Sequence, residues 1–171
     1  MEGRRALVSE VQALVAKSSA PAPRRATSGL DAARVAMVLA VLERRGRQPV
    51  ATSDVYAATV GGVRLVEPAA DLAIALAVAG AARDLSLPGD LVAIGEVGLA
   101  GEVRPVGGLA ARLSEAARLG FRRALVPAAV DIDVDGITAI PVADLARALT
   151  LLNDSVSTRP IGNVVHLDAV S

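Results

Sequence analysis

The side chains that most often carry out covalent or metal chemistry are scarce in this sequence. It holds no Cys, one His (His166) and one Lys (Lys17) among 171 residues. Within this chain, that inventory excludes disulfides, thiolate zinc sites, His-based metal clusters and a Cys nucleophile. A hydroxyl nucleophile would need a base, because it attacks poorly until its proton is removed.

Two carboxylates and one hydroxyl are the remaining candidates for chemistry. Glu67 and Asp71 flank a Pro-Ala-Ala run and could form an acid/base pair. We favour the simpler interpretation that Asp71 lies in the first turn of a helix, where the helix dipole stabilises a negative charge. Ser114 is expected on a helix surface without a basic partner, and His166 is expected in the C-terminal tail, solvated or packed.

Arginine supplies most of the positive charge, and it is unevenly distributed. Residues 1–47 carry nine Lys/Arg and four Asp/Glu, a net charge of +5, and the remainder carries nine and fourteen, a net charge of −5. Guanidinium groups suit phosphate oxygens because they donate two parallel hydrogen bonds. The candidate phosphate contacts are Arg24 and Arg25, then Arg44, Arg45 and Arg47, and finally Arg122 and Arg123.

Each arginine cluster also has a purely structural interpretation. Arg44, Arg45 and Arg47 could complement the negative end of a helix dipole. Arg122 and Arg123 could form a solvated edge before a buried strand. Arg24 and Arg25 have the weakest structural explanation, since they lie in a Pro-, Ser- and Ala-rich segment.

Apolar periodicity predicts the elements that must position these side chains. Alternation predicts a strand over residues 5–16, followed by a loop or extended arm over 17–28. Helical spacing predicts helices over 31–45, 68–83, 109–119 and 142–151, the second of them buried on nearly all faces. Strands are expected at 54–60, 63–66, 91–94, 123–126 and 137–140, with the first two joined by a Gly-Gly turn and a glycine-punctuated hairpin at 95–108.

The length of the chain fits a single domain. The mixed order of predicted strands and helices places it in the α/β or α+β class. Hydrophobic residues make up 53% of the sequence and aromatic residues 1%, so the core must be aliphatic. Scarce aromatics argue against nucleic-acid domains that stack bases on rings. No signal peptide is recognisable, and the longest apolar run, 72–82, is shorter than the about 20 residues that span a bilayer. We expect a cytoplasmic protein.

Two segments resemble the Lon protease family. One is GGVRLVEPAADLA over residues 61–73, and the other is GEVGLAGEVRPVGGL over residues 95–109. The second is similar to the Lon pattern G-E-[IV]-x-L-x-G-x-[VL]-x-P-[IV]-G-G. The resemblance implies the Lon proteolytic-domain fold, an α/β unit related to the second domain of ribosomal protein S5.

The chain further resembles the C-terminal Lon-like domain of the RadA (Sms) family of bacterial DNA-repair proteins. The matching segments are EGRR at 2–5, VQALV at 11–15, PRR at 23–25, GLD at 29–31, DVY at 54–56, EPAAD at 67–71 and ARLGFRRA at 117–124. This implies a Lon-like domain over residues 1–152. The tail over 153–171 lies outside the resemblance and has no strong pattern, so we expect it to be loose or partly docked. The resemblance also implies a missing N-terminal portion holding a zinc finger and an ATPase, so ATP, Mg and Zn are expected only there. This chain has no G-x-x-x-x-G-K-[ST] loop.

The resemblance also implies that protease chemistry is lost. Lon uses a serine deprotonated by a lysine whose pKa is lowered. Ala69 stands where the serine of the P-S-A-G run is expected, and Ala110 stands where the lysine follows G-G-[LIV]. Lys17 does not replace the missing lysine by spacing. We therefore expect no catalysis by this domain.

Two functions remain open, and a third is a minor alternative. The first is a non-catalytic domain of a DNA-dependent ATPase and branch-migration helicase in recombinational repair, which scaffolds a hexameric ring and contacts duplex or branched DNA. Because the chain is neutral overall, its own DNA binding is expected to be weak. The second is a purely structural oligomerisation module without DNA contact. The third is residual hydrolysis of an unfamiliar type.

Overall fold

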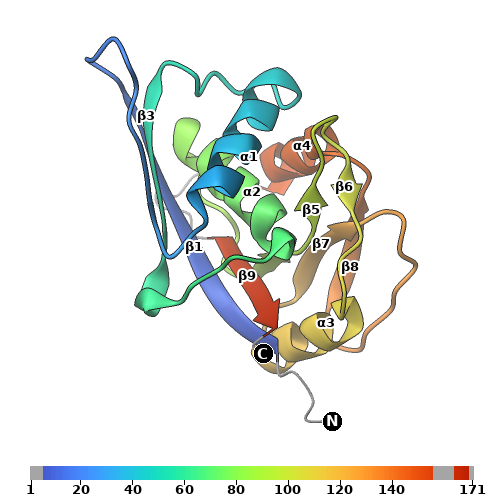
Figure 1. Ribbon diagram of the computed structural model, residues 1–171. Coiled ribbons are helices and arrows are strands. Elements are labelled where there is room, and N and C mark those ends of the chain that lie inside the picture. The colour runs from blue at the N-terminus through green and yellow to red at the C-terminus, as the bar shows by residue number, and fades with distance from the viewer. Residues whose placement is uncertain (1–5, 156–163, 170–171) are drawn as a thin grey trace.

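A mixed sheet forms the centre of the protein (Figure 1). The computed structural model describes residues 6–155 and 164–169, with side chains placed for residues 6–153. In these described ranges the main sheet has seven strands: β1 (Ala6–Lys17), β2 (Arg25–Ser28), β3 (Ser53–Thr59), β4 (Leu91–Ala93), β7 (Arg123–Pro127), β8 (Thr138–Val142) and β9 (Val164–Ala169). Their spatial order is β2-β3-β1-β9-β4-β7-β8. Strand β1 is antiparallel to both neighbours, and the remaining pairings are parallel.

Helices cover both faces of the sheet. The four described helices are α1 (Ala32–Arg44), α2 (Asp71–Ala82), α3 (Leu109–Arg118) and α4 (Leu145–Ser155). Side chains of α1, α2 and α4 share one core with Leu91 and Ala93, while α3 shares a second core with Val92 and Ile94. Successive residues of β4 therefore point into opposite cores, as the pleat of a strand requires. This confirms a mixed α/β domain, whereas a specifically Lon-like fold stays a prediction.

Helix α1 begins and ends as its sequence indicates. Asp31 caps it, because its Oδ1 accepts a hydrogen bond from the backbone N–H of Arg34 at 2.8 Å. Its apolar stripe is buried: Val35, Val38, Leu39, Val41 and Leu42. Each such side chain contributes roughly 1.5–3 kcal/mol through burial. The basic residues at its end are left in solvent.

Helix α2 is buried on nearly all sides, as predicted. Its residues 71–80 are all buried, including Leu72 and Leu76 with no exposed surface. The helix follows a short 3-10 turn, η2 (Pro68–Ala70), and packs parallel to α1. Arg34 bonds Asp71 where both helices begin, and Gln48 accepts a bond from Arg83 just beyond where both end. These two contacts fix the relative direction of the helices.

The glycine-rich segment forms the predicted hairpin, with β5 (Glu96–Val97) antiparallel to β6 (Val103–Arg104). Gly98 lies at its turn, where a Cβ would stand 2.1 Å from Oε1 of Glu102. That carboxylate ends a flexible side chain and can move aside. Gly95, just before β5, is more constrained, since a Cβ there would lie 2.6 Å from Cγ1 of the short Val103 side chain.

One local prediction was wrong and two were partly right. The loop or extended arm expected over 17–28 ends in β2, which the four residues RATS form because they pair with β3. The strand expected at 63–66 is absent from the described structure, where Leu65 makes only an isolated bridge to Leu30, after the 3-10 turn η1 (Val60–Gly62). The tail expected to be loose or partly docked supplies β9, which pairs with β1.

Strand β9 is central rather than peripheral. It pairs with β1 from Ala6 opposite Ala169 to Val11 opposite Val164, and it bridges to β4 at Val92. It lies between α2 and α3. The two halves of the sheet are thus joined through the C-terminal segment. The position of His166 is on β9, whose side chains fall outside the described residues.

No helix in the described ranges is long and apolar enough to cross a membrane.

Candidate functional site

A cavity of about 480 Å³ lies where the two motif segments meet. The start of β1, the turn η2, strand β5, the segment after β6 and the first turn of α3 contribute to it. Its apolar lining consists of Ala6, Pro68, Ala69, Pro105, Val106 and Ala111. Its charged lining consists of Glu67, Glu96 and Arg112.

A largely buried ion pair closes one side of this cavity. Nη2 of Arg112 lies 2.6 Å from Oε2 of Glu67, and Nε of Arg112 donates to the carbonyl of Gly107 at 3.1 Å. The Arg112 side chain is only 6% exposed. A buried charge is tolerated when it is paired and hydrogen-bonded. Arg112 therefore ties α3 to the segment before η2.

The two positions of the expected dyad do not line the same cavity. Ala69 is buried and lines the cavity described above. Ala110 is exposed and lines a different hollow, with Ser114 and the loop before β8. Its neighbour Ala111 faces the Ala69 cavity instead. Ser114 donates its hydroxyl to the carbonyl of Ala110 at 2.9 Å, the ordinary bond of a helix-surface serine.

Lys17 lies far from both alanines. Ala6 lines the cavity at the first residue of β1, whereas Lys17 is the last residue of the same strand. Eleven residues of extended chain span about 36 Å. The only lysine of the sequence therefore cannot act as a base at the cavity.

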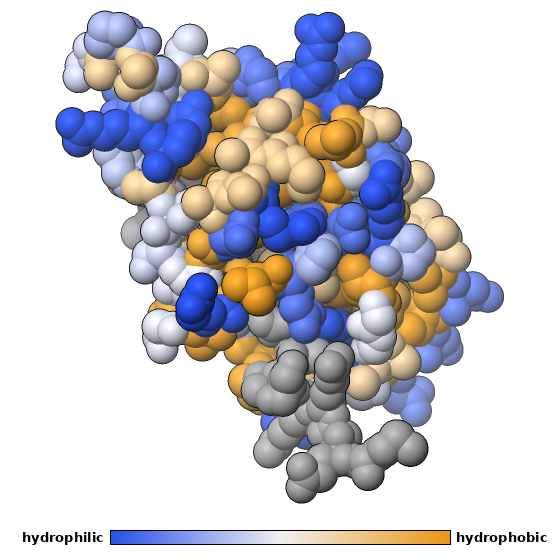
Figure 2. Space-filling view, viewed as in Figure 1, coloured by the Kyte–Doolittle hydropathy of each residue, from blue (hydrophilic) through white to orange (hydrophobic). Residues whose placement is uncertain are grey.

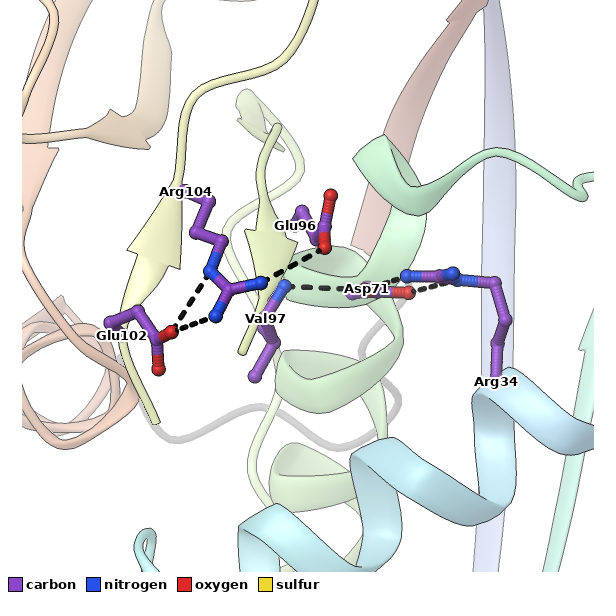
Figure 3. A network of polar contacts seen from close by, with 6 residues as sticks. All are labelled: Arg34, Asp71, Glu96, Val97, Glu102 and Arg104. Atoms are coloured by element: carbon purple, nitrogen blue, oxygen red, sulfur yellow. Dashed lines mark hydrogen bonds and ion pairs between the residues drawn. The ribbon is translucent and has the colours of Figure 1, made fainter. Parts of the chain in front are cut away.

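Asp71 occupies a buried polar network next to the cavity (Figure 3). Its Oδ1 and Oδ2 accept bonds from Nε and Nη2 of Arg34 at 2.9 and 2.5 Å, and Oδ2 also accepts from the backbone N–H of Val97 at 3.2 Å. Burial raises the pKa of Asp71, opposed by the bonds from Arg34 and Val97. The hydrogen bond that Arg34 donates to Asp71 raises the pKa of Arg34. Asp71 thus joins α1, α2 and β5.

A second part of this network lies on the hairpin. Arg104 bonds Glu102, with Nε 2.9 Å from Oε1, and its Nη1 lies 3.6 Å from Oε1 of Glu96 (Figure 3). Two carboxylates therefore share one guanidinium. Glu67 and Asp71 belong to separate ion pairs, with Arg112 and Arg34 respectively. The structure therefore does not bring them together as an acid/base pair.

Five of the seven candidate arginines lie at one end of the protein together with Lys17: Arg24, Arg25, Arg44, Arg45 and Arg47. We call this the basic end. Contacts of the segment after α1 bring these residues together. Oε2 of Glu43 accepts from the backbone N–H groups of Val50 and Ala51, and Nη2 of Arg25 donates to the carbonyl of Val50 at 2.9 Å. Figure 2 shows strongly hydrophilic side chains projecting at the upper end, where α1 ends.

The guanidinium groups at the basic end are not equivalent. Those of Arg24, Arg44, Arg45 and Arg47 are exposed and make no hydrogen bond or ion pair with any residue that the structure describes. Arg25 instead donates to the carbonyls of Val50, Ala51 and Ser53 and so holds the segment before β3. The backbone N–H of Arg24 bonds Asp54 at 2.7 Å, which lowers the pKa of that carboxyl.

Arg122 and Arg123 lie elsewhere. Five strand spacings separate β2 from β7, about 24 Å across the sheet. Arg123 pairs with Asp90 at 2.6 Å, which lowers the pKa of Asp90, and Arg122 donates to the carbonyl of Gly136 at 3.3 Å. The structure therefore does not bring this pair to the basic end.

The chain aligns with bacterial DNA repair proteins over most of its length. It is 50% identical over 159 residues to the DNA repair protein RadA of Mycobacterium tuberculosis (strain H37Rv), which covers 93% of this chain and 33% of that protein. The chain is a relative of RadA. Identity to the DNA repair protein RadA of Escherichia coli (strain K12) is 48% over 155 residues, covering 90% of this chain and 34% of that protein. Identity to the DNA repair protein RadA of Synechocystis is 44% over 151 residues, covering 88% of this chain and 30% of that protein.

These alignments confirm the resemblance to RadA found in the sequence. The chain spans about a third of the length of the RadA proteins it matches. A family model described as subunit ChlI of Mg-chelatase also matches residues 61–130. Apart from Ala6, every residue that lines the cavity falls within that matched range.

Three residues important to the geometry were missed from the sequence: Arg34, Glu96 and Arg112. Arg112 had a signal, because it is a charged residue on the apolar stripe of α3 with Leu109, Leu113 and Ala116. A charge on such a stripe indicates a buried partner. Arg34 and Glu96 had no comparable signal, since their partners are 37 and 8 residues away in the sequence.

Proposed function

We propose that this chain is a non-catalytic, Lon-like domain of a RadA-type DNA repair protein, and that its basic end contributes DNA contacts. The observation that carries the proposal is the gathering of Arg24, Arg44, Arg45 and Arg47 at one end, each with an exposed guanidinium group. Phosphates attract such groups with little structural cost, because no internal partner has to be broken. The DNA-repair names of the relatives agree with this use.

The non-catalytic role is supported by three residues. Ala69 lines the cavity with a methyl group, Ala110 faces another hollow, and Lys17 stands at the far end of β1. A serine–lysine mechanism needs both side chains in hydrogen-bonding distance. The whole protein would take ATP, Mg and Zn in its other portions. We propose for it DNA-dependent ATPase and branch-migration activity in recombinational repair, with this domain scaffolding a hexameric ring.

Fluorescence anisotropy of labelled duplex DNA at low ionic strength tests the role of the basic end. The test variant replaces Arg24, Arg44, Arg45 and Arg47 with Gln and keeps Arg25, whose loss would disturb the segment before β3. If all four contact phosphates, the slope of log affinity against log salt should fall by about 3.6, four times about 0.9. The double variant Arg44→Gln/Arg45→Gln can be matched with Arg64→Gln/Arg118→Gln, which removes the same charge elsewhere.

Unchanged affinity and slope in the quadruple variant would overturn the DNA role. A second function then takes its place, a purely structural oligomerisation module. It is favoured by the internal use of Arg25 and Arg123, which removes two of the seven candidates from direct DNA binding. Light scattering together with the anisotropy test distinguishes the two, because a hexamer that does not bind DNA selects the structural module.

A further inference from the structure

The cavity carries an excess of negative charge that its own residues do not neutralise. Arg112 pairs with Glu67, whereas Glu96 and Glu102 share the guanidinium of Arg104. In the described structure the Glu96 carboxylate makes no hydrogen bond, and its one ion pair, to Arg104, is long at 3.6 Å. Its side chain is 33% exposed, so a ligand can reach it.

The lining selects for a cation on an apolar stem. Six of the eleven lining residues are Ala, Pro or Val. An arginine or lysine side chain presents a hydrocarbon stem to such walls and a charged head to a carboxylate. Burying the carboxylate of Glu96 against a guanidinium satisfies both groups, whereas an anion would be repelled.

A segment with this chemistry projects from the opposite end of the protein. The loop between β1 and β2 extends as a narrow projection (Figure 1). It carries the sequence SSAPAPRR over residues 18–25, and Ser19, Ala20, Pro21, Ala22 and Arg24 are exposed. The Arg24 guanidinium has no hydrogen bond or ion pair in the described structure.

One chain cannot place its own loop in its own cavity. The cavity lies at the first residue of β1, and the loop follows its last residue, about 36 Å away along the strand. The rigid pairing of β1 with β3 and β9 prevents it from folding back. A loop that fills the cavity must therefore come from another copy.

We propose that the cavity between η2 and α3 binds the Arg24-bearing loop of a second copy of this chain, with Arg24 bonded to Glu96. This deepens the self-association proposed above and rests on it. The two surfaces differ, so the contact is head-to-tail and forms a ring if the rotation closes. In an assembled ring Arg24 bonds Glu96 and only Arg44, Arg45 and Arg47 meet DNA, so the salt slope of the quadruple variant would fall by about 2.7, three times about 0.9, instead of about 3.6.

The cavity is tested first with a peptide of residues 18–27, blocked at both ends, added to the isotope-labelled 171-residue chain. We expect saturable shifts at the amides of Ala6, Glu96, Gly107 and Ala111. Glu96→Gln should weaken binding by about tenfold or more, because it removes a charged acceptor while keeping its shape. The peptide with Arg24→Gln should bind equally poorly.

Two further variants control for folding and for charge. Ala111→Leu fills the cavity from an exposed helical position that tolerates leucine, so binding should be lost while the fold is retained. Asp84→Asn removes an exposed carboxylate just beyond the end of α2, about 20 Å from the cavity. Asn tolerates its positive φ of 52°. This control should bind as the unaltered chain does.

Self-association identifies the source of the loop. In light scattering, Arg24→Gln, Glu96→Gln and Ala111→Leu should each lower the mass at a given concentration, while Asp84→Asn should not. DNA anisotropy with Glu96→Gln separates this from the basic-end proposal, because Glu96 is not at that end. A peptide that binds elsewhere or ignores Glu96→Gln overturns the site. If the peptide binds but Arg24→Gln, Glu96→Gln and Ala111→Leu do not lower self-association, the loop that fills the cavity does not come from a second copy.

Discussion

Arg34 and Asp71 form a bidentate ion pair in which the carboxylate is fully buried and the guanidinium is about a quarter exposed, 0% against 26%. The pair joins the first turns of α1 and α2, and a bond from Val97 extends it to the hairpin. Since only one partner can reach water, the two residues are not equivalent energetically. Removing the cation strands a buried charge, and removing the carboxylate does not.

Arg34→Ala is therefore expected to lower the free energy of unfolding by about 3–5 kcal/mol. Asp71→Asn should cost less, because the remaining guanidinium can turn toward solvent. Urea unfolding at neutral pH measures both. Arg64→Ala, at an exposed arginine, serves as the control and should stay within about 0.5 kcal/mol of the unaltered chain. Equal losses for Arg34→Ala and Asp71→Asn would contradict the asymmetry.

The raised pKa of Asp71 predicts a pH dependence of stability. Its ordinary value is 3.8, and burial moves the folded-state pKa above that. Between these two values the folded state binds more protons than the unfolded state, so stability falls as pH rises. Relative to Asp71→Asn, the unaltered chain should lose stability through this window and show a constant difference above it. An unaltered chain that gains stability relative to Asp71→Asn as pH rises would contradict a raised pKa.

Restoring the dyad by sequence alone is predicted to fail. Ala69→Ser/Ala110→Lys would place the hydroxyl in the cavity and the amine in a different hollow. Ala69→Ser/Ala111→Lys instead directs both groups to one cavity. Fluorogenic peptide cleavage and labelling by a serine-directed probe should be absent for the first pair. Labelling of the first pair at the rate of the second would show that position 110 does reach the cavity.

Gly29 and Gly61 form a matched pair for testing close packing. Both have positive φ, 72° and 77°, but a Cβ at Gly29 would lie 2.5 Å from the carbonyl oxygen of Val63, whereas the space around Gly61 is open. Gly61→Ala should cost about 1–2 kcal/mol for the left-handed backbone alone. Gly29→Ala should cost clearly more, measured by thermal or urea unfolding. Similar losses would mean that the segment at Val63 yields easily.

Truncation after Ser155 tests the role of β9. The shortened chain loses the strand between β1 and β4, so both become edges within a split sheet. We expect a lower melting temperature and aggregation through the new edges. A chain ending at residue 169 retains β9 and is the control. A truncated chain with an unchanged melting temperature would show that β9 adds nothing to stability.

Most elements could be predicted from the sequence because their signals are local. The buried stripe of α1, the all-round apolar face of α2 and the glycine turns of the hairpin each depend on residues within one element. Strand β2 has no such signal, since its stability comes from backbone pairing with β3. Residues 63–66 have an apolar pattern but lack a partner strand beyond the Leu30–Leu65 bridge.

The candidate site shows the same division. The sequence alone determined that this chain lacks Cys and holds one lysine, that Ala69 and Ala110 stand where the Lon resemblance predicts the dyad, and that its motifs resemble those of RadA, because these depend only on residue types and order. Tertiary structure decided that Ala110 and Ala69 line different hollows, that Arg112 pairs with Glu67, and that Arg24 lies at the same end as Arg44–Arg47 but not Arg123. It also made β9 the centre of the sheet. The physical reason is that pairing across the sheet and burial between layers join residues far apart in the chain, and local patterns carry no record of those partners.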